Sequence, residues 1–389
     1  MRDVSVAVVL TLVIQASVSA AVFTPPVLAP VASRELGIGA ASAGVSTALI
    51  YLTATLAALA SGGFIGRLGP IRTSQVCLLL VGAGIALMAA GHVAAAAIGA
   101  LMIGLGYGAI TPSSSAILNE RTPIRIRALI FSIKQTGVPI GGAMAGALIP
   151  PLMASAGWKW AALLCGVLSL AVAVLVQPGR ASTDAVRNPA VRLGRIRLRE
   201  PLRLVWKHRP LRDMALASFT YSGMQMCIGS YLVVSLHEVA AMSVAAAGAA
   251  LAAAMTGGIV GRIGWGIVAD RAIAPRRLLG LLGVGMALCA FCVGLIDGQW
   301  PWIGVAGFAF VFGATGIGWN GVYLSEVALI APRGTAADAT GGSLAFTYVG
   351  VVILPLAIWA VVTAGLGYGA GFVLVGALTL WRALVFFRR

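Results

Sequence analysis

The segment QPGRASTDAVRNPAVRLGRIRLREPLRLVWKHRP, from Gln177 to Pro210, is the longest polar interval of a 389-residue chain that is otherwise strongly apolar. Ten of the 27 Lys and Arg residues lie between Arg180 and Arg212. Long apolar runs precede this basic segment and follow it. The segment therefore divides the chain into two halves of similar length.

The composition on both sides of the basic segment indicates that the lipid bilayer is the solvent. The chain is 60% hydrophobic and 10% charged, with a mean hydropathy of +0.99, whereas soluble domains carry about 25% charged residues. Apolar runs of about 20 residues, enough for a helix to cross the ~30 Å hydrocarbon layer, recur from Val4 onward. The net charge of +16 would suit a nucleic acid. We expect no nucleic-acid binding, because the basic residues lie in the segment and in alternate short loops.

Breaks marked by Gly, Pro and charge predict twelve membrane-spanning helices. Their approximate ranges are 5–30, 40–64, 74–91, 93–118, 128–153, 157–177, 213–236, 244–268, 278–296, 302–327, 341–363 and 367–386. If the N-terminus is cytoplasmic, the loops on the outer side hold only Arg34 and Lys159. Because basic residues concentrate on the cytoplasmic side of membrane proteins, we predict that both termini face the cytoplasm.

The start of the chain and its use of basic residues bear on location. The first apolar run imitates a signal peptide but continues through Val31, so we expect a retained span. Arg supplies 24 of the 27 basic residues, and Ala and Gly are abundant, which is typical of a GC-rich bacterial genome. The prediction is a multi-pass protein of the bacterial inner membrane, in contact with the lipid bilayer.

Correspondences between the two halves indicate an internal repeat. Gly104 corresponds to Gly313 and Gly141 to Gly350, both at a displacement of 209 positions. Repeats of this kind are common in transporters. The predicted domains are a six-helix bundle at 1–178, a basic cytoplasmic linker at 179–212 and a second six-helix bundle at 213–389.

A loop motif appears once in each half, after the second and the eighth predicted span. The C-terminal copy contains Gly266, Asp270, Arg271, Arg276 and Arg277, and the N-terminal copy contains Gly62, Arg67, Gly69 and Arg72, with Gly66 in place of the acid. The pattern G-x-x-x-D-R-x-G-x-x-R resembles that of the major facilitator superfamily, and the resemblance covers the whole chain. It implies an all-α membrane protein of twelve helices in two pseudo-symmetric bundles.

The resemblance also implies that these loops lock the cytoplasmic ends of the helices together. It assigns gating to Arg67, Arg72, Asp270 and Arg271, with a weaker lock in the N-terminal half, where Asp is missing. The alternative is that Arg67 and Arg72 serve only to orient the chain.

The fifth predicted span carries small residues and a proline: Gly137, Pro139, Gly141 and Gly142. These resemble the Gly-Pro-x-x-Gly-Gly pattern of antiporters in the superfamily, with one residue inserted. Small residues allow helices to approach closely, so either a pivot or simple close packing accounts for them.

Three ionisable residues fall inside predicted spans, where charge is costly and is a functional hypothesis by default. Lys134, Arg262 and Glu326 each lie about 10–12 Å from a cytoplasmic helix end, at ~1.5 Å per residue. Arg262 with Gly266 and Asp270 resembles the eighth helix of monocarboxylate and oxalate/formate transporters, in which an Arg meets the substrate carboxylate. The alternative for Arg262 is gating, which an Arg upstream of the loop motif commonly serves in the superfamily. For Lys134 the alternative is a side chain that extends to the cytoplasmic surface. Glu326 is the candidate for coupling to a proton, for pairing with one of the cations or for stabilising the end of the tenth helix.

Uncharged polar and aromatic residues in the spans complete the predicted substrate site. The candidates are Gln15, Tyr107, Gln135, Tyr221, Gln225, Trp319, Asn320 and Tyr323. Such residues also serve as ordinary hydrogen-bonding groups between helices.

These features predict a secondary transporter for a small organic anion, a carboxylate, that works by alternating access. A drug/proton efflux antiporter of the same superfamily is the alternative. We expect a monomer, no enzyme activity, no cofactor and no metal, because no nucleophile or metal-ligand constellation appears in the sequence.

Overall fold

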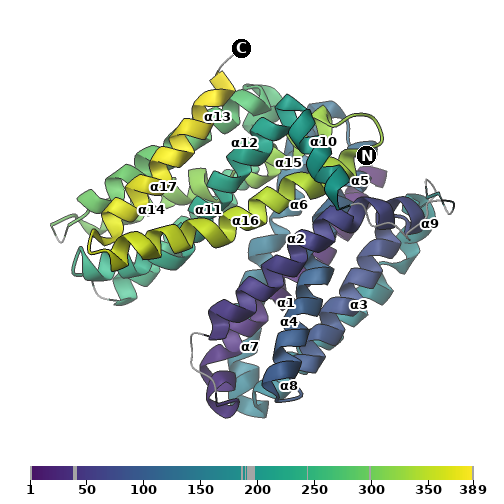
Figure 1. Cartoon of the computed structure of the whole chain (residues 1–389), viewed down its shortest axis with the longest axis horizontal. Coiled ribbons are helices and arrows are strands. Elements are labelled where there is room, and N and C mark those ends of the chain that lie inside the picture. Colours follow the sequence, from purple (N-terminus) through teal and green to yellow (C-terminus); the bar gives the residue numbers. More distant parts are fainter. Residues whose placement is uncertain are drawn as a thin grey trace. The chain divides into compact units, whose positions relative to one another are not determined.

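The computed structural model describes residues 2–37, 42–184, 187, 188, 190, 198–242, 244–297 and 299–387. The secondary structure of these residues is α-helix with short 3-10 turns, and they contain no strand (Figure 1). The prediction of an all-α protein is confirmed. Two compact units make up the chain, and each is described separately.

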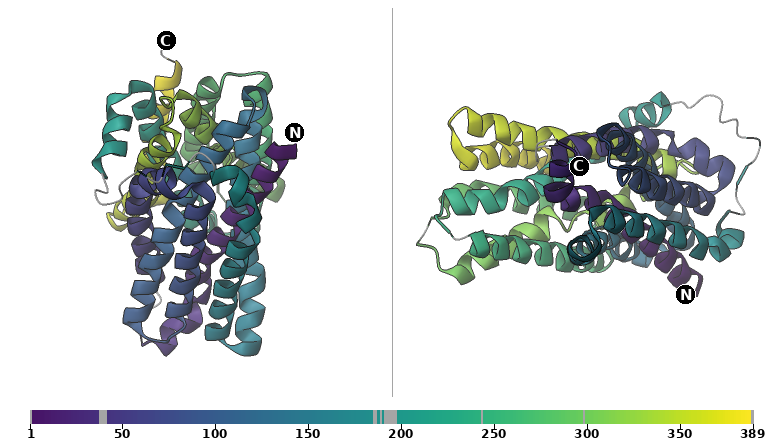
Figure 2. Two further views of the ribbon diagram at one scale, coloured as in Figure 1. Left: turned by 90° about the vertical axis from the view of Figure 1, so that its right-hand side faces the viewer. Right: turned by 90° about the horizontal axis from the view of Figure 1, so that it is seen from below.

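Unit 1 comprises Met1–Thr122, Ile133–Leu204 and Ala331–Ala345. Its helices are α1 (Arg2–Glu35), α2 (Ser42–Leu68), α3 (Pro70–Met88), α4 (Val93–Gly108), α5 (Ile110–Arg121), α7 (Gly137–Ala156), α8 (Trp158–Leu175) and the short α9 (Arg180–Thr183). Helix α4 packs against both α2 and α3, and α1 packs along α7. Figure 2 shows these long helices, coloured purple to blue, running in a common direction.

Unit 2 comprises Pro123–Ser132, Val205–Ile330 and Phe346–Arg389. Its helices are α11 (Arg209–Glu238), α12 (Val244–Arg271), α13 (Pro275–Cys292), α14 (Trp302–Gly316), α15 (Asn320–Ile330) and α17 (Gly367–Leu384). Helix α12 packs on α14, and α13 packs on α17. Three further helices, α6 (Arg127–Gln135), α10 (Arg199–Lys207) and α16 (Ala336–Thr363), pass from one unit into the other.

In its described residues each of the twelve predicted spans falls on helix, and eleven segments in this part of the chain are long and apolar enough to cross a membrane. The segment predicted at 213–236 lies within α11 but is not among the eleven. Polar residues such as Ser218, Ser222 and Gln225 lower its hydropathy. The chain thus has the architecture of a multi-pass membrane protein.

Prolines interrupt two of the spans. Pro112 is the third residue of α5 and Pro139 is the third residue of α7. A proline has no N–H, so the carbonyl four residues earlier loses its helical hydrogen bond. The preceding helices accordingly end at Gly108 and Gln135. A third interruption, at 317–319, separates α14 from α15.

Glycines place the same helix contacts in both units, which supports the internal repeat. Gly104 in α4 lies so close to the Ile50 carbonyl in α2 that a methyl group would overlap it. Gly313 in α14 stands in the same relation to the Ala254 carbonyl in α12. The helix pairs α2–α4 and α12–α14 therefore approach backbone to backbone at equivalent positions, as small residues permit.

Candidate functional site

A buried polar cluster in unit 1 is centred on Lys134, which is 1% exposed. Its Nζ atom donates to Gln15 Oε1 at 2.8 Å and to Gln135 Oε1 at 2.9 Å, and it lies 3.5 Å from Thr111 Oγ1. Gln15 Nε2 in turn donates to Ser19 Oγ at 3.1 Å. The ammonium group is thus held inside unit 1, among amide and hydroxyl oxygens.

Helix interruptions bring the members of this cluster together. Lys134 and Gln135 end α6 immediately before the interruption at Thr136, and Thr111 follows the interruption at Ala109. Gly137 lies against the side chain of Gln15, where a Cβ would be 2.9 Å from Gln15 Cβ. The absence of a side chain at Gly137 leaves room for the Gln15 amide beside Lys134.

Tyr107 lies on α4, two residues before the interruption at Ala109, and is half-buried. Its ring packs edge-to-face on Tyr51, with ring centroids 6.2 Å apart. Of the four site residues predicted in this unit, the structure brings Lys134, Gln15 and Gln135 into direct hydrogen-bond contact. Tyr107 forms an aromatic pair with α2.

A second cluster, in unit 2, is built around the interruption between α14 and α15. Arg262 on α12 is 2% exposed, and its Nε donates to the Ile317 carbonyl at 3.2 Å. Trp265, one turn later, donates from Nε1 to the Ala314 carbonyl at 2.7 Å. These donors satisfy carbonyl groups that the end of a helix leaves without intrahelical partners. Arg262 is thereby fixed against the interrupted tenth span.

Aromatic residues surround the residue that follows this interruption. The ring of Trp319 is edge-to-face with Tyr221 at 5.5 Å and with Tyr323 at 5.2 Å between centroids. Trp319 is fully buried, and its Nε1 has no hydrogen-bond partner. Next to it, Asn320 Nδ2 donates to Gln225 Oε1 at 3.0 Å. A buried donor without an acceptor is rare and calls for an explanation, such as a ligand.

Tyr221 differs from its neighbours in where its hydroxyl points. The hydroxyl donates to the Leu279 carbonyl on α13 at 2.8 Å. Only the ring of Tyr221 therefore contributes to the aromatic cluster. Its polar atom is used to join α11 to α13.

Two aspartates cap helices at the expected loop motifs. Asp270 accepts hydrogen bonds from the backbone amides of Ala128 at 2.9 Å and Leu129 at 2.8 Å, in the first turn of α6. Asp184 accepts in the same way from the amides of Ile71 and Arg72, at 2.9 and 3.1 Å, in the first turn of α3. Carboxylates are favoured at helix N-termini because they pair with the unsatisfied amides there.

Asp184 was not a candidate from the sequence. The available signal was its position as the one acid in the first part of the basic segment, directly after the sixth span. The basic members of the N-terminal motif, Arg67 and Arg72, are exposed, and Arg72 also donates to Gln75 Oε1 at 3.3 Å. Arg271 is exposed as well.

The remaining predicted acid, Glu326 on α15, is half-buried and has Arg276 as a charged neighbour. Arg276 also pairs with Asp213 at 3.3 Å. Within the described residues, no group of three His, Cys, Asp or Glu side chains is placed to hold a metal ion.

The predicted packing glycines lie between α7 and α1. Gly141 contacts the Ala16 carbonyl, and Gly142 faces the Phe23 ring, where a Cβ would be 3.3 Å away. Pro139, beside them, is the cause of the interruption at Thr136.

The sequence model of one protein family, the Major Facilitator Superfamily, matches residues 10–355 of the chain. The chain therefore belongs to this superfamily and is a transporter, not an enzyme.

The curated relatives that match the chain are named as transporters of organic acids. The 4-hydroxybenzoate transporter PcaK of Pseudomonas putida is 30% identical over 166 residues, which are 41% of this chain and 37% of that protein. The gentisate transporter of Corynebacterium glutamicum is 26% identical over 295 residues, 72% of this chain and 64% of the relative. The match to the first of these thus spans little more than a third of its length.

Solved structures with the same fold cover almost the whole chain. The human organic anion transporter TETRAN has a TM-score of 0.76 at 18% identity, with 99% of each chain covered. A bacterial homologue of the iron transporter ferroportin has a TM-score of 0.79 at 15% identity, covering 100% of this chain and 99% of the other. At these identities the likeness establishes the fold.

Proposed function

We propose that this transporter moves a hydroxylated aromatic carboxylate across the bacterial inner membrane by alternating access. In this proposal the chain is a monomer with twelve spans and cytoplasmic termini, and its bundles are residues 1–178 and 213–389, joined by the linker 179–212. The relatives named for 4-hydroxybenzoate, gallate and gentisate support the substrate class.

The observation that carries the proposal is the pair of buried cations at helix interruptions. Lys134 lies in the last turn of α6, beside one interruption, and Arg262 is bonded to the Ile317 carbonyl, directly after α14, at another. The interruptions at Ala109 and at 317–319 correspond at the repeat displacement of 209 positions, and Thr111, which follows the first, lies 3.5 Å from Lys134 Nζ. Interrupted helices in corresponding parts of the two halves are a pointer to the substrate site of a transporter. Since Glu120 is the only acid between residues 36 and 183, the first half of the chain favours an anion.

Arg262 is the residue we assign to the substrate carboxylate. A guanidinium group binds a carboxylate through parallel hydrogen bonds and stays charged in a dry site. The bond from Nε to the Ile317 carbonyl fixes the orientation of its plane. Lys134 supplies the second positive charge, and Gln15 and Gln135 hold its ammonium group in place.

The aromatic cluster of unit 2 suits the ring of such a substrate. Trp319 and Tyr323 offer ring faces and edges, and aromatic pairs gain about 0.5–1.5 kcal/mol beyond area burial. The Nε1 donor of Trp319, which has no partner, suits a phenolic or carboxylate oxygen. Asn320 and Gln225 are further polar candidates beside it.

The test is uptake of radiolabelled 4-hydroxybenzoate, gallate and gentisate into proteoliposomes. We expect uptake of at least one of them, and loss of it in Arg262→Gln and Lys134→Gln. Arg209→Gln, at an exposed position of the α11 start, is the matched control and should transport normally. Full uptake in both site variants would refute the anion site.

Gating and coupling complete the proposed cycle. The Asp270 cap on α6 would break and re-form as the transporter alternates. Arg67, Arg72 and Arg271 are the basic loop residues that we assign to gating. If transport is coupled to protons, Glu326 is the membrane-embedded acid that we assign to coupling. Uptake in Glu326→Gln should then lose its response to an imposed pH gradient.

Drug efflux in exchange for protons is the second candidate. The close packing of Gly141 on α1 favours it, because the superfamily pattern that Gly137, Pro139, Gly141 and Gly142 resemble is associated with antiporters. A strain that expresses the protein should then resist amphipathic drugs without taking up aromatic acids. Uptake without resistance would exclude this alternative.

A further inference from the structure

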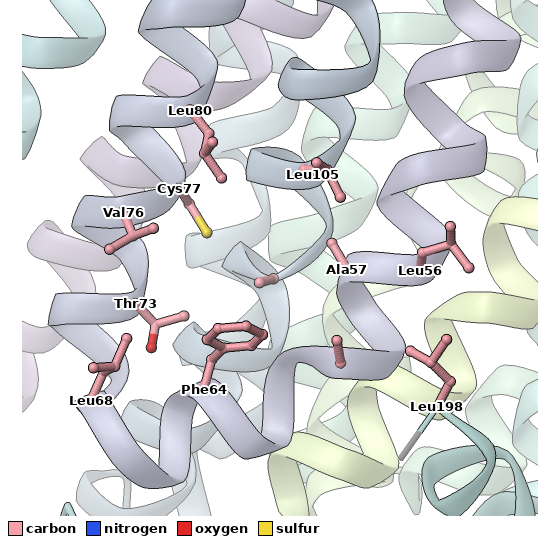
Figure 3. A pocket seen from close by; sticks show the side chains of 12 residues that line it. Leu56, Ala57, Phe64, Leu68, Thr73, Val76, Cys77, Leu80, Leu105 and Leu198 are labelled. Atoms are coloured by element: carbon pink, nitrogen blue, oxygen red, sulfur yellow. The ribbon is translucent and has the colours of Figure 1, made fainter. Parts of the chain in front are cut away.

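A long apolar slot runs along the side of unit 1, between α2 and α3, with α4 behind it. Its volume is about 410 Å³, within the ~300–1,000 Å³ that small-molecule sites occupy. The lining residues are Leu56, Ala57, Ala60, Phe64, Leu68, Thr73, Val76, Cys77, Leu80, Leu105, Ala109 and Leu198 (Figure 3). Thr73 is the one hydroxyl among them, and it donates to the Gly69 carbonyl at 2.8 Å. The walls therefore offer a ligand almost nothing but hydrocarbon.

The slot has the length of one lipid chain. Along α2 its lining extends from Leu56 to Leu68, which is about 18 Å at 1.5 Å per residue. One leaflet is half of the ~30 Å hydrocarbon layer, or about 15 Å. The slot thus spans about one leaflet.

The slot opens on the surface of unit 1. Leu56, Val76 and Leu105 are 43%, 40% and 39% exposed. Large apolar side chains exposed on a helix that crosses the bilayer are suited to contact with lipid. An acyl chain is the hydrocarbon that is present there at the highest concentration.

Positive charge gathers at one end of the slot. Arg67 precedes Leu68, Arg72 precedes Thr73, and Arg199 follows Leu198, and all three arginines are exposed. The acids at this end are Asp184, Glu200 and Asp338, whose carboxylate lies against Gly62 on α2. Asp184 already occupies the amides of the α3 N-terminus and lies 3.3 Å from Arg180. An anionic headgroup therefore meets guanidinium groups at this end, not the helix N-terminus.

We propose that this slot binds an anionic phospholipid, with one acyl chain between α2 and α3 and the phosphate on Arg67 and Arg72. The slot does not suit the transported substrate, because no cation lies in its walls to meet a carboxylate. A zwitterionic lipid would fill the hydrocarbon part equally well but would gain less from the arginines. Basic side chains near an anionic headgroup contribute about 1 kcal/mol each.

Native mass spectrometry of the full chain in detergent tests the proposal, with phosphatidylglycerol and phosphatidylcholine of identical acyl chains as probes. We expect the protein to retain phosphatidylglycerol in preference to phosphatidylcholine. Ala60→Trp, which fills the slot, should abolish retention of both lipids. The double variant Arg67→Gln with Arg72→Gln should weaken phosphatidylglycerol binding about thirtyfold, the equivalent of about 1 kcal/mol per arginine, and leave phosphatidylcholine unchanged.

The controls are a Trp on another exposed helix surface, Val174→Trp on α8, and Arg277→Gln. Both should bind lipid like the parent chain. If Ala60→Trp is not monodisperse, Ala57→Leu fills the same wall with a smaller side chain.

Three results would overturn the proposal. The first is unchanged lipid retention in a folded variant with a filled slot. The second is equal binding of the two lipids, and the third is competition by glycerol 3-phosphate, which has the anionic group without the chains. Because none of these measurements involves transport, they are independent of the substrate assigned above.

Discussion

Asp270→Ala removes the carboxylate that caps α6, and we expect it to expose Ser132. In the structure, residues 123–132 belong to unit 2, where Asp270 accepts from the amides of Ala128 and Leu129 at 2.9 and 2.8 Å. Ser132 packs against Gly266 and Gly321 and is fully buried. Separation of the α6 start from α12 would therefore uncover it.

The magnitude follows from the cap. Replacing an N-cap acid by Ala costs about 0.5–2 kcal/mol of stability. Both carboxylate oxygens of Asp270 accept a backbone amide, so we take the upper value of about 2 kcal/mol. These bonds exist only when the start of α6 is docked on α12. Their loss therefore shifts the equilibrium between the docked and the separated state by the same free energy, in favour of the separated state. Since about 1.4 kcal/mol is a factor of ten, we expect an increase of about thirtyfold.

The assay uses Ser132→Cys in a chain whose native cysteines are replaced by Ala: Cys77, Cys165, Cys227, Cys289 and Cys292. Ser132 Oγ has no hydrogen-bond partner, so the thiol should be tolerated. A membrane-impermeant maleimide applied to inverted membrane vesicles reports the labelling rate from the cytoplasmic side.

Asp184→Ala is the matched control for this experiment. It removes the same kind of cap, on α3, but both partners belong to unit 1, so labelling at residue 132 should not change. The reasoning is refuted if Asp270→Ala labels at the parent rate, or if Asp184→Ala accelerates labelling equally.

Four further outcomes are expected. Arg262→Lys should lose more than tenfold in uptake although it keeps the charge, because an ammonium group cannot form the parallel bonds of a guanidinium group; initial rates against substrate concentration measure this. Trp319→Phe keeps a ring but removes the N–H. Because one hydrogen bond contributes about 1 kcal/mol, the KM for a hydroxylated substrate should rise about fivefold, whereas the KM for benzoate should change little. Gly141→Leu should lower Tm in detergent, because α7 contacts the α1 backbone there and overpacking costs about 1–3 kcal/mol. Hydrogen bonds from Lys159 and Trp158 hold the pKa of Glu35 below its usual 4.5, so the contacts of the Glu35 carboxylate stabilise the fold above pH 4.5 and are lost as the pH falls through the lowered pKa. A series of Tm measurements should show a small decrease of Tm at acid pH, and Lys159→Ala should remove that decrease.

The sequence predicted the helices and the repeat well, because both depend on local patterns. Each of the twelve predicted segments falls on helix in its described residues, and the Gly104–Gly313 correspondence reappears as equivalent helix contacts. The helix interruptions were less visible. Pro112 and Pro139 were present in the printed sequence, but Ile317–Trp319 contains no proline, and its interruption depends on donors from Arg262 and Trp265 on another helix.

Side-chain direction was the least predictable feature of the site. Tyr221 and Gln225 lie one turn apart on α11, yet the first donates to a backbone carbonyl of α13 and the second accepts from Asn320. A polar side chain in a span gives no sign of which neighbour it will meet, since that depends on packing between helices far apart in the chain. The assignment of these residues to substrate binding stays a prediction.

The missing acid of the N-terminal loop motif has a counterpart within unit 1. Position 66, where the superfamily usually has Asp, is Gly, and the carboxylate of Asp338, in the first turn of α16, lies directly against Gly62 on α2. A side chain at residue 62 would overlap that carboxylate. In unit 2 the acid is in the last turn of α12 and caps the start of α6, whereas in unit 1 the acid is in the first turn of α16 and contacts α2. The glycine at 62 is thus required by the acid at 338, and the two halves use opposite placements of the carboxylate at equivalent ends of their helices.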